Sequence, residues 1–434
     1  MKRLAFVFAS TILAACSSEE GNTGDAPTVS DSAGIRIIRN GAVGLIPQAV
    51  LDSPTLALRI GTADGDSMLQ FFRPGPVAVD DSGFVYVADG GHYQVRVFDG
   101  RGRFVRRFGG RGSGPGEFQG LNALHVFRDT VAVLDIRAWR LVLFNRQGVA
   151  LGTENIRDDR GGRISYVSRV DDGWIVNPPR TPADVPHGVE RRDTIRLMWV
   201  SSITKAMEKW RGSAADTLPA DTTEQRNVVT FLSGRRFGHQ SPLFLTTIYP
   251  LFEPHPAYAA DGRGNLYYTD ATSYLIDVYD TRGRHTRRIT RAHSPIPITD
   301  AMVGGVASLM RAHWDTASLG GESAAAKSNG EATLILPHVA RLSPIGRMFA
   351  SRNGSLWVER IDLHSDPVAL QWGRGPPPEP SKWDHFDPVG QFLGTVTFPP
   401  NFIPRFAGDR WMLGQLRDEM DIPYIARFAL VIPE

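Results

Sequence analysis

The sequence contains almost no cysteine, since Cys16 is the only one among 434 residues. A single cysteine excludes disulfide bonds within the chain. The fold must therefore be stabilised by packing, and a chain of this length can bury a large core. The apolar stretch near the N-terminus covers only residues 4–13, whereas a membrane-spanning helix needs about 20.

Charge of one sign is not in excess either. Lys and Arg together number 48 and Asp and Glu 46, and without Lys2 and Arg3 the two counts are equal. This balance argues against nucleic acid as a partner and against a polybasic membrane patch. The glycine-rich segment 109–116 lacks the Gly-Lys-Ser/Thr ending of a phosphate-binding loop, so we interpret it as a connection between repeats.

The N-terminus has the layout of a bacterial signal peptide, with two basic residues ahead of a short apolar stretch. The stretch ends in Leu13-Ala14-Ala15-Cys16, which resembles the lipobox of bacterial lipoproteins. The resemblance implies a signal peptide over 1–15 and lipid attachment at Cys16. Ser17 at the next position resembles the sorting signal for the outer membrane, facing the periplasm.

After the lipid site, residues 16–33 have no apolar period, so we expect a flexible tether. We expect a single domain over 34–434. Its main feature is self-similarity, because a unit of four short alternating strands begins near Val77 and recurs from Tyr258 at a constant offset of 181 positions. Eight positions match between the two units, and in the first unit they are Asp80, Gly83, Asp89, Tyr93, Val97, Asp99, Gly102 and Arg103.

A further copy lies 46 positions after the first, where Trp139 replaces Tyr93, and weaker copies bring the number of units to six. Four-stranded units of about this length predict an all-β fold, a six-bladed β-propeller of four-stranded antiparallel blades. The last unit has room for three strands only. We expect residues 55–61 to supply the fourth strand and so close the ring.

The first unit also carries a family resemblance. Its residues 77–89, 95–102 and 112–118 resemble the NHL repeat. Together with the lipobox and with Asp31-Ser32-Ala33-Gly34-Ile35, they make the chain similar to bacterial six-bladed β-propeller lipoproteins. The resemblance implies a fold far more than an activity.

Two stretches depart from the repeat. Residues 211–255 show no clean period, and we expect them to supply outer strands of the third blade. Residues 295–343 are expected to form a small helical insertion between blades 4 and 5, because apolar side chains recur at three- and four-residue spacing after Thr299, a candidate N-cap.

Three aspartates occupy one equivalent repeat position, and three aromatic residues follow them at another. Their carboxylates could hold a cation, although caps on their own turns explain the repetition without a ligand. We therefore expect no cofactor and no metal, and treat the six as candidates for a ligand-binding face: Asp89, Tyr93, Asp135, Trp139, Asp270 and Tyr274.

Two other groups deserve a hypothesis. His125, His255 and His338 begin inferred inner strands and could form a zinc site, but they are not repeat-equivalent. Trp372 and Trp383 flank a proline-rich loop and are expected to be exposed, as a binding loop or a plain insertion.

The sequence shows no nucleophile–base pair and no metal motif. It favours a monomeric, non-catalytic binding module held at the membrane by its lipid, with an envelope protein or a small ligand as partner. The alternative is a metal-dependent hydrolase or lyase of the lactonase or esterase type, with its site in the central channel.

Overall fold

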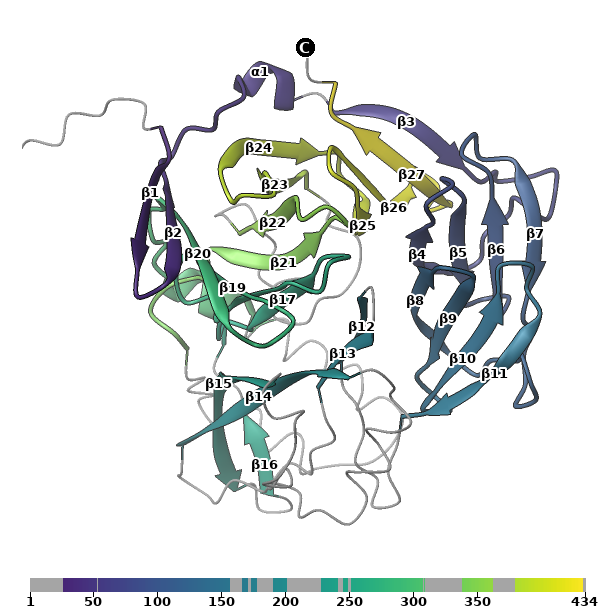
Figure 1. The fold of residues 1–434 in the computed structure, drawn as a ribbon, viewed down its shortest axis with the longest axis horizontal. Coiled ribbons are helices and arrows are strands. Elements are labelled where there is room, and N and C mark those ends of the chain that lie inside the picture. The colour runs from purple at the N-terminus through teal and green to yellow at the C-terminus, as the bar shows by residue number, and fades with distance from the viewer. Residues whose placement is uncertain are drawn as a thin grey trace, which may run out of the picture.

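The computed structural model describes residues 26–52, 54–156, 166–170, 173–177, 190–200, 228–240, 245–248, 251–306, 308, 338–361 and 379–431. Six sheets are arranged in a ring around a central axis (Figure 1). The fold is therefore the all-β, six-bladed propeller that the repeat predicts.

Four blades contain four antiparallel strands each. Blade 1 consists of β4 (Pro74–Val79), β5 (Val85–Asp89), β6 (Gln94–Phe98) and β7 (Phe104–Phe108). Blade 2 consists of β8 (Leu121–Phe127), β9 (Thr130–Asp135), β10 (Arg140–Asn145) and β11 (Ala150–Asn155). Blade 5 consists of β21 (Ile345–Ala350), β22 (Leu356–Arg360), β23 (Ser381–Phe386) and β24 (Phe392–Phe398). Blade 6 consists of β25 (Phe402–Ala407), β26 (Trp411–Arg417), β27 (Pro423–Ala429) and β3 (Thr55–Ile60).

Blades 3 and 4 have additional strands. Blade 3 has five: β12 (Tyr166–Val170), β13 (Gly173–Asn177), β14 (Glu190–Val200), β15 (Val228–Gln240) and β16 (Leu245–Ile248). Its last two strands confirm the outer strands expected within 211–255. Blade 4 consists of β17 (Ala257–Ala260), β18 (Leu266–Thr269), β19 (Leu275–Tyr279) and β20 (His285–Arg291), followed by β2 (Ile35–Asn40) and β1 (Thr28–Ser32).

The repeated Asp and Gly residues form the tight turns between strands. Asp80 Oδ1 accepts hydrogen bonds from the backbone N–H groups of Ser82 and Phe84, each at 2.9 Å. Gly83 follows with a φ of +81°, a conformation that glycine adopts without steric cost. Asp261 caps the equivalent turn of blade 4 in the same way, which explains why these positions recur.

Because neighbouring strands alternate in direction, the turns between second and third strands lie on the same face as the crossovers between blades. We call this the crossover face. The turns between first and second strands, and between third and fourth, lie on the opposite face. Asp89, Asp135 and Asp270 all come at second-to-third turns and hence on the crossover face.

The ring is closed as expected. β3 pairs antiparallel with β27, in a register from Thr55↔Ala429 to Ile60↔Ile425. Leu58 and Ile60 are buried with Leu413 of blade 6 and with side chains of blade 1. Five other apolar clusters occupy the remaining junctions between successive blades, so each blade packs against both of its neighbours.

The N-terminal segment corrects one expectation. Residues 28–32, placed in the flexible tether, form β1, which pairs with β2 in a hairpin. β2 in turn adds in parallel to β20 on the outer edge of blade 4. Its last residue, Asn40, donates to the carbonyls of Thr290 and Gly390, and so joins blade 4 to blade 5. Residues 16–25 and the signal peptide expected over 1–15 lie outside the described residues.

The insertion after blade 4 is helical over residues 300–306. Thr299 Oγ1 accepts from the N–H of Met302 at 3.4 Å, as expected for its N-cap position. Val306 is buried with Leu251, Phe252 and other apolar residues. Residues 309–337 of the insertion lie outside the described part. In that part, no helix is long and apolar enough to cross a membrane.

Candidate functional site

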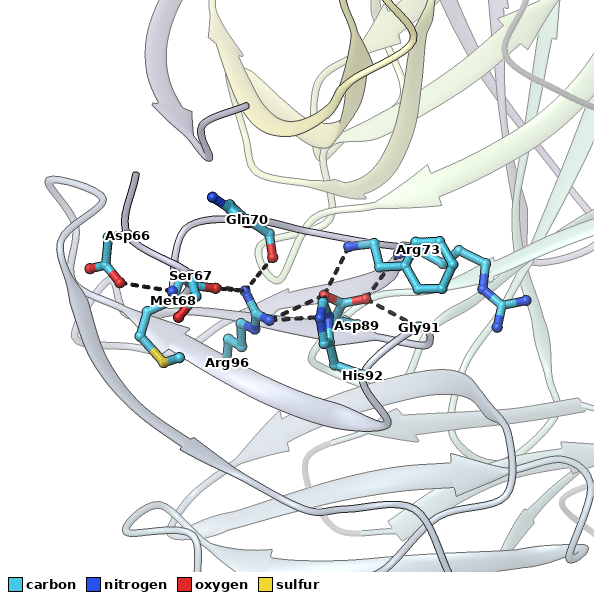
Figure 2. Close-up of polar contacts among 10 residues, drawn as sticks. Asp66, Ser67, Met68, Gln70, Arg73, Asp89, Gly91, His92 and Arg96 are labelled. Atoms are coloured by element: carbon cyan, nitrogen blue, oxygen red, sulfur yellow. Dashed lines mark hydrogen bonds and ion pairs between the residues drawn. The ribbon is translucent and has the colours of Figure 1, made fainter. Parts of the chain in front are cut away.

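Asp89 ties the crossover into blade 1 to the end of the second strand. Its side chain is fully buried, and its carboxylate accepts from the backbone N–H groups of Phe72 at 3.2 Å, Arg73 at 3.0 Å and Gly91 at 3.1 Å. Figure 2 shows these contacts. Burial alone would raise the pKa of Asp89, but the hydrogen bonds from Arg73, His92 and Phe72 hold it below its usual value.

The side chains of His92 and Arg96 complete this cluster. His92 Nδ1 lies 2.8 Å from Asp89 Oδ2, and because a carboxylate requires a donor we assign the proton to Nδ1. The buried guanidinium of Arg96 lies 3.6 Å from the same oxygen. Its Nη1 also donates to three crossover carbonyls, of Ser67, Met68 and Gln70 (Figure 2). The charge of Asp89 is thus compensated inside the protein.

Blade 2 repeats the arrangement. Asp135 is fully buried and accepts from the N–H groups of Gln119 and Gly120, at 3.0 and 2.9 Å. Arg140 lies 3.5 Å from Asp135 and donates to the carbonyls of Ser113 and Glu117 in the crossover. Asp89 and Asp135 therefore act as the turn caps that the repeat suggested, and burial keeps both away from any ligand.

We call Asp89 with Arg96, and Asp135 with Arg140, the clamps of blades 1 and 2, because each pair joins a crossover to the turn after the second strand. Two residues beside the clamps have an unusual backbone. Tyr93 has a φ of +57° and Trp139, at the equivalent position, a φ of +51°. Bulky side chains rarely adopt this left-handed conformation, which costs of order 1–3 kcal/mol and is often retained at functional sites. Both side chains are partly exposed on the crossover face. Strain at the same position of two successive blades makes this face our candidate site.

Aromatic and cationic side chains surround these two residues. Phe72 is 62% exposed and contacts His92 edge to face, with 6.2 Å between ring centroids. The guanidinium of Arg73 lies 5.3 Å from the Phe72 ring centre, and that of Arg111 lies 5.5 Å from the Tyr93 ring centre. We call Phe72, Arg73, Tyr93, Arg111, Arg137 and Trp139 the blade 1–2 patch.

Arginine dominates the charge of the patch. Arg73, Arg111 and Arg137 are exposed, and among the described residues none of them has an acidic partner. The buried aspartates beneath the patch, Asp89 and Asp135, are already compensated by Arg96 and Arg140. The patch therefore presents uncompensated positive charge next to aromatic rings.

In each clamp, a glycine allows the crossover and the turn after the second strand to approach each other closely. In blade 1 a Cβ on Gly91 would meet Phe72 at 2.1 Å, so the crossover supplies the large side chain and the turn the glycine. In blade 2 the roles are exchanged, because a Cβ on Gly120 of the crossover would meet Arg137 of the turn at 2.9 Å. These complementary pairs place Phe72 and Arg137 on the surface, and repeat comparison alone does not reveal them.

The glycine-rich crossover between blades 1 and 2 is not a phosphate loop. It connects β7 to β8, as expected. The N–H of Gly114 donates to Glu117 Oε2 at 2.8 Å, and a Cβ on Gly112 would lie 2.0 Å from that oxygen. The carboxylate of Glu117 therefore already occupies the position that an anion would take.

Blade 4 does not continue the site. Asp270 is exposed and caps only its own turn, through Thr272. Tyr274 is buried, and its hydroxyl donates to Asp384 of blade 5 at 2.6 Å. Burial and the charge of Asp384 raise the pKa of Tyr274 well above its usual value. As a member of a ligand face, Tyr274 was a wrong candidate, because its partner comes from another blade.

The other candidate groups do not assemble. His255 and His338 are exposed, whereas His125 packs edge to face on Trp174, with 5.8 Å between the rings. Among the described residues, no group of three His, Cys, Asp or Glu side chains is placed to hold a metal ion. Trp383, expected to be exposed, is fully buried on β23, and Trp372 lies outside the described residues.

Comparison with known proteins agrees with this architecture. A family model described as a 6-bladed beta-propeller matches residues 72–166, which include blades 1 and 2 with their clamps and the patch. No curated protein has a significantly similar sequence.

Similar solved structures include a protein of Bacteroides fragilis described as exported (12% identity, 92% of this chain and 100% of that chain, TM-score 0.44). A member of the DUF4221 family from Bacteroides vulgatus is 11% identical (88% and 98%, TM-score 0.46). A virginiamycin B lyase from Staphylococcus aureus, solved with quinupristin, is 10% identical (86% and 98%, TM-score 0.38). Such distant likeness does not indicate what this chain binds.

Proposed function

We propose that the protein is an exported, lipid-anchored, monomeric binding module whose blade 1–2 patch contacts an acidic protein partner in the cell envelope. The observation that carries the proposal is the left-handed backbone of Tyr93 and Trp139 on one face of successive blades. A strained aromatic residue could be replaced by glycine or asparagine at lower energy. Each ring packs in part against the core beside it, and the exposed part of the same ring, present in two successive blades, supports a role in binding.

The composition of the patch supports a protein partner. Tyr, Trp and Arg are the residue types that contribute most to binding energy at protein interfaces. Arg73, Arg111 and Arg137 carry positive charge without an acidic partner among the described residues. Acidic groups of a partner would compensate this charge and speed association, so that binding should weaken as salt is raised.

The test compares partner recovery from envelope extracts by the wild-type protein and by the double variant Tyr93→Asn, Trp139→Asn. Asparagine tolerates the left-handed conformation, so the backbone is kept while the rings are removed. The control is Val389→Asn, which removes an exposed apolar side chain from the opposite face. We expect a salt-sensitive partner with the wild type and the control, and its loss from the double variant. Equal recovery by all three proteins would refute the proposed face.

Lipid anchoring is tested separately at Cys16. We expect Cys16→Ala to accumulate as an unprocessed precursor that takes up no labelled fatty acid, and Ser17→Ala to be processed and labelled normally. If Cys16→Ala is still cut and released, the lipid is not attached there, and the anchoring part of the proposal is wrong.

A second candidate function rests on the pair formed by Asp89 and His92. A buried carboxylate that orients a half-exposed imidazole is also the arrangement of a general base. If the protein is a hydrolase or lyase, esters or lactones should be turned over by the wild type and not by His92→Gln. Metal analysis of the purified protein distinguishes the metal-dependent form, since stoichiometric bound zinc or calcium would favour it.

A further inference from the structure

The innermost strands of several blades contain β-bulges. Figure 1 shows that the first strand of each blade lies nearest the centre of the ring. In β25 the pairing with β26 shifts between Pro404 and Phe406, which leaves Arg405 as the extra residue. In β21 the pairing shifts between Ile345 and Met348, so that Arg347 also lies in an irregular segment. Bulges redirect side chains and occur frequently beside functional sites.

Arg405 carries a charge that nothing in the described part of the chain neutralises. It forms no ion pair and no side-chain hydrogen bond there. Its side chain is exposed to water, and yet desolvation by the surrounding protein and the charge of Arg347 lower its pKa. Arg405 belongs to β25, the innermost strand of blade 6, and hence to the part of the blade near the axis rather than at the outer surface (Figure 1).

Arg347, on the neighbouring blade, is held in a fixed orientation. Its Nε donates to Glu359 Oε2 at 2.9 Å and its Nη2 to Oε1 at 2.8 Å, a two-point contact. The Nη1 group forms no hydrogen bond to a described residue, and the side chain is 40% exposed. Glu359 thus compensates one of the two guanidinium groups and leaves a net charge of one.

We propose that Arg405 and the free Nη1 group of Arg347 together bind the oxygen atoms of an anionic group, a carboxylate or a phosphate, near the axis between blades 5 and 6. Guanidinium groups match both anions because their donors are planar and correctly spaced. Glu359 orients Arg347, and the bulge brings Arg405 out of the strand pairing. The site uses other blades than the patch, so it does not depend on the proposed function.

The experiment follows the melting temperature of the purified protein as inorganic phosphate or succinate is added at constant ionic strength. A ligand that binds the folded state raises the melting temperature in a saturable way. We expect such a rise for the wild type with at least one of the two anions, and at least a tenfold weaker apparent affinity for Arg405→Gln. The anion with the larger effect identifies the chemistry of the site.

Two further variants make the result specific. Arg36→Gln, exposed on β2 at the rim, removes the same charge far from the axis and should bind like the wild type. Arg405→Lys keeps the charge but not the two-point geometry and should bind with intermediate affinity, which also tests the site if Arg405→Gln folds poorly. A wild type without a saturable response to either anion would overturn the proposal, and so would Arg405→Gln binding like the wild type.

Discussion

His385 on β23 should make the protein less stable in mild acid. The imidazole is 1% exposed and stacks on Trp357, with 4.0 Å between ring centroids and 11° between the planes. Neither ring nitrogen has a hydrogen-bond partner in the described part of the chain. Burial lowers the pKa of His385 to about 4, from an ordinary 6.5, although the nearby Asp409 opposes the shift.

The lowered pKa determines the direction of the effect. Below pH 6.5 the unfolded chain takes up a proton at this histidine, whereas the folded chain does not until about pH 4. The stability contributed by the neutral ring is therefore complete above pH 6.5 and declines between pH 6.5 and 4. At about 1.4 kcal/mol for each pKa unit, the total is about 3 kcal/mol, of which about 2 kcal/mol is lost between pH 7.5 and pH 5.

The assay is urea unfolding at pH 7.5 and pH 5 for the wild type and His385→Phe. Phenylalanine keeps an aromatic ring on Trp357 and removes the titrating group, so the variant should lose about 2 kcal/mol less between the two pH values. The control, His255→Phe at an exposed position, keeps the buried imidazole and should retain the wild-type difference. If His385→Phe loses as much stability as the wild type, the ring is not held neutral in the fold.

Two substitutions test the clamps and the closure of the ring by the same unfolding measurement. Asp89→Ala should cost about 3–5 kcal/mol, because it leaves the buried cation of Arg96 without its partner, whereas Asp270→Ala at the equivalent but exposed position should cost less than about 1 kcal/mol. Equal losses would mean that the buried carboxylate does not hold the crossover. Ile60→Ala, buried on β3, should cost about 2–5 kcal/mol, and Leu56→Ala, exposed on the same strand, should change little. A small loss at Ile60 would show that β3 is not needed to close the ring.

The sequence predicts the ring because each tight turn between strands requires particular residue types. Asp80 and Gly83 form a capped turn that has few substitutes, and so they recur at a constant offset. The closing strand is also predictable, since the last unit lacks one strand and residues 55–61 match it in pattern. The β1–β2 hairpin was missed because it adds to blade 4 in parallel, outside the repeat, and no copy elsewhere in the chain predicts that position.

The site is less predictable, because partners from other blades decide what a repeat position does. Tyr93 and Tyr274 match in the alignment of repeats. Tyr274 nevertheless becomes buried, because Asp384 of blade 5 accepts its hydroxyl hydrogen and Arg291 approaches the same carboxylate. The repeat in the sequence predicts the strands and turns of a blade. It does not predict which side chains of the next blade will contact them.

Contacts between a crossover and the neighbouring turn limit prediction of the site in the same way, because the large side chain and the glycine exchange places between blades 1 and 2. Phe72 can project to the surface because Gly91 lies beneath it, and Arg137 can do so because Gly120 does. Each large residue and its glycine lie on different loops, so neither position is informative alone. The residues that distinguish one blade from another are thus paired across crossovers. Comparing such pairs between blades, rather than single repeat positions, would have placed Phe72 and Arg137 on the crossover face before a structure was available.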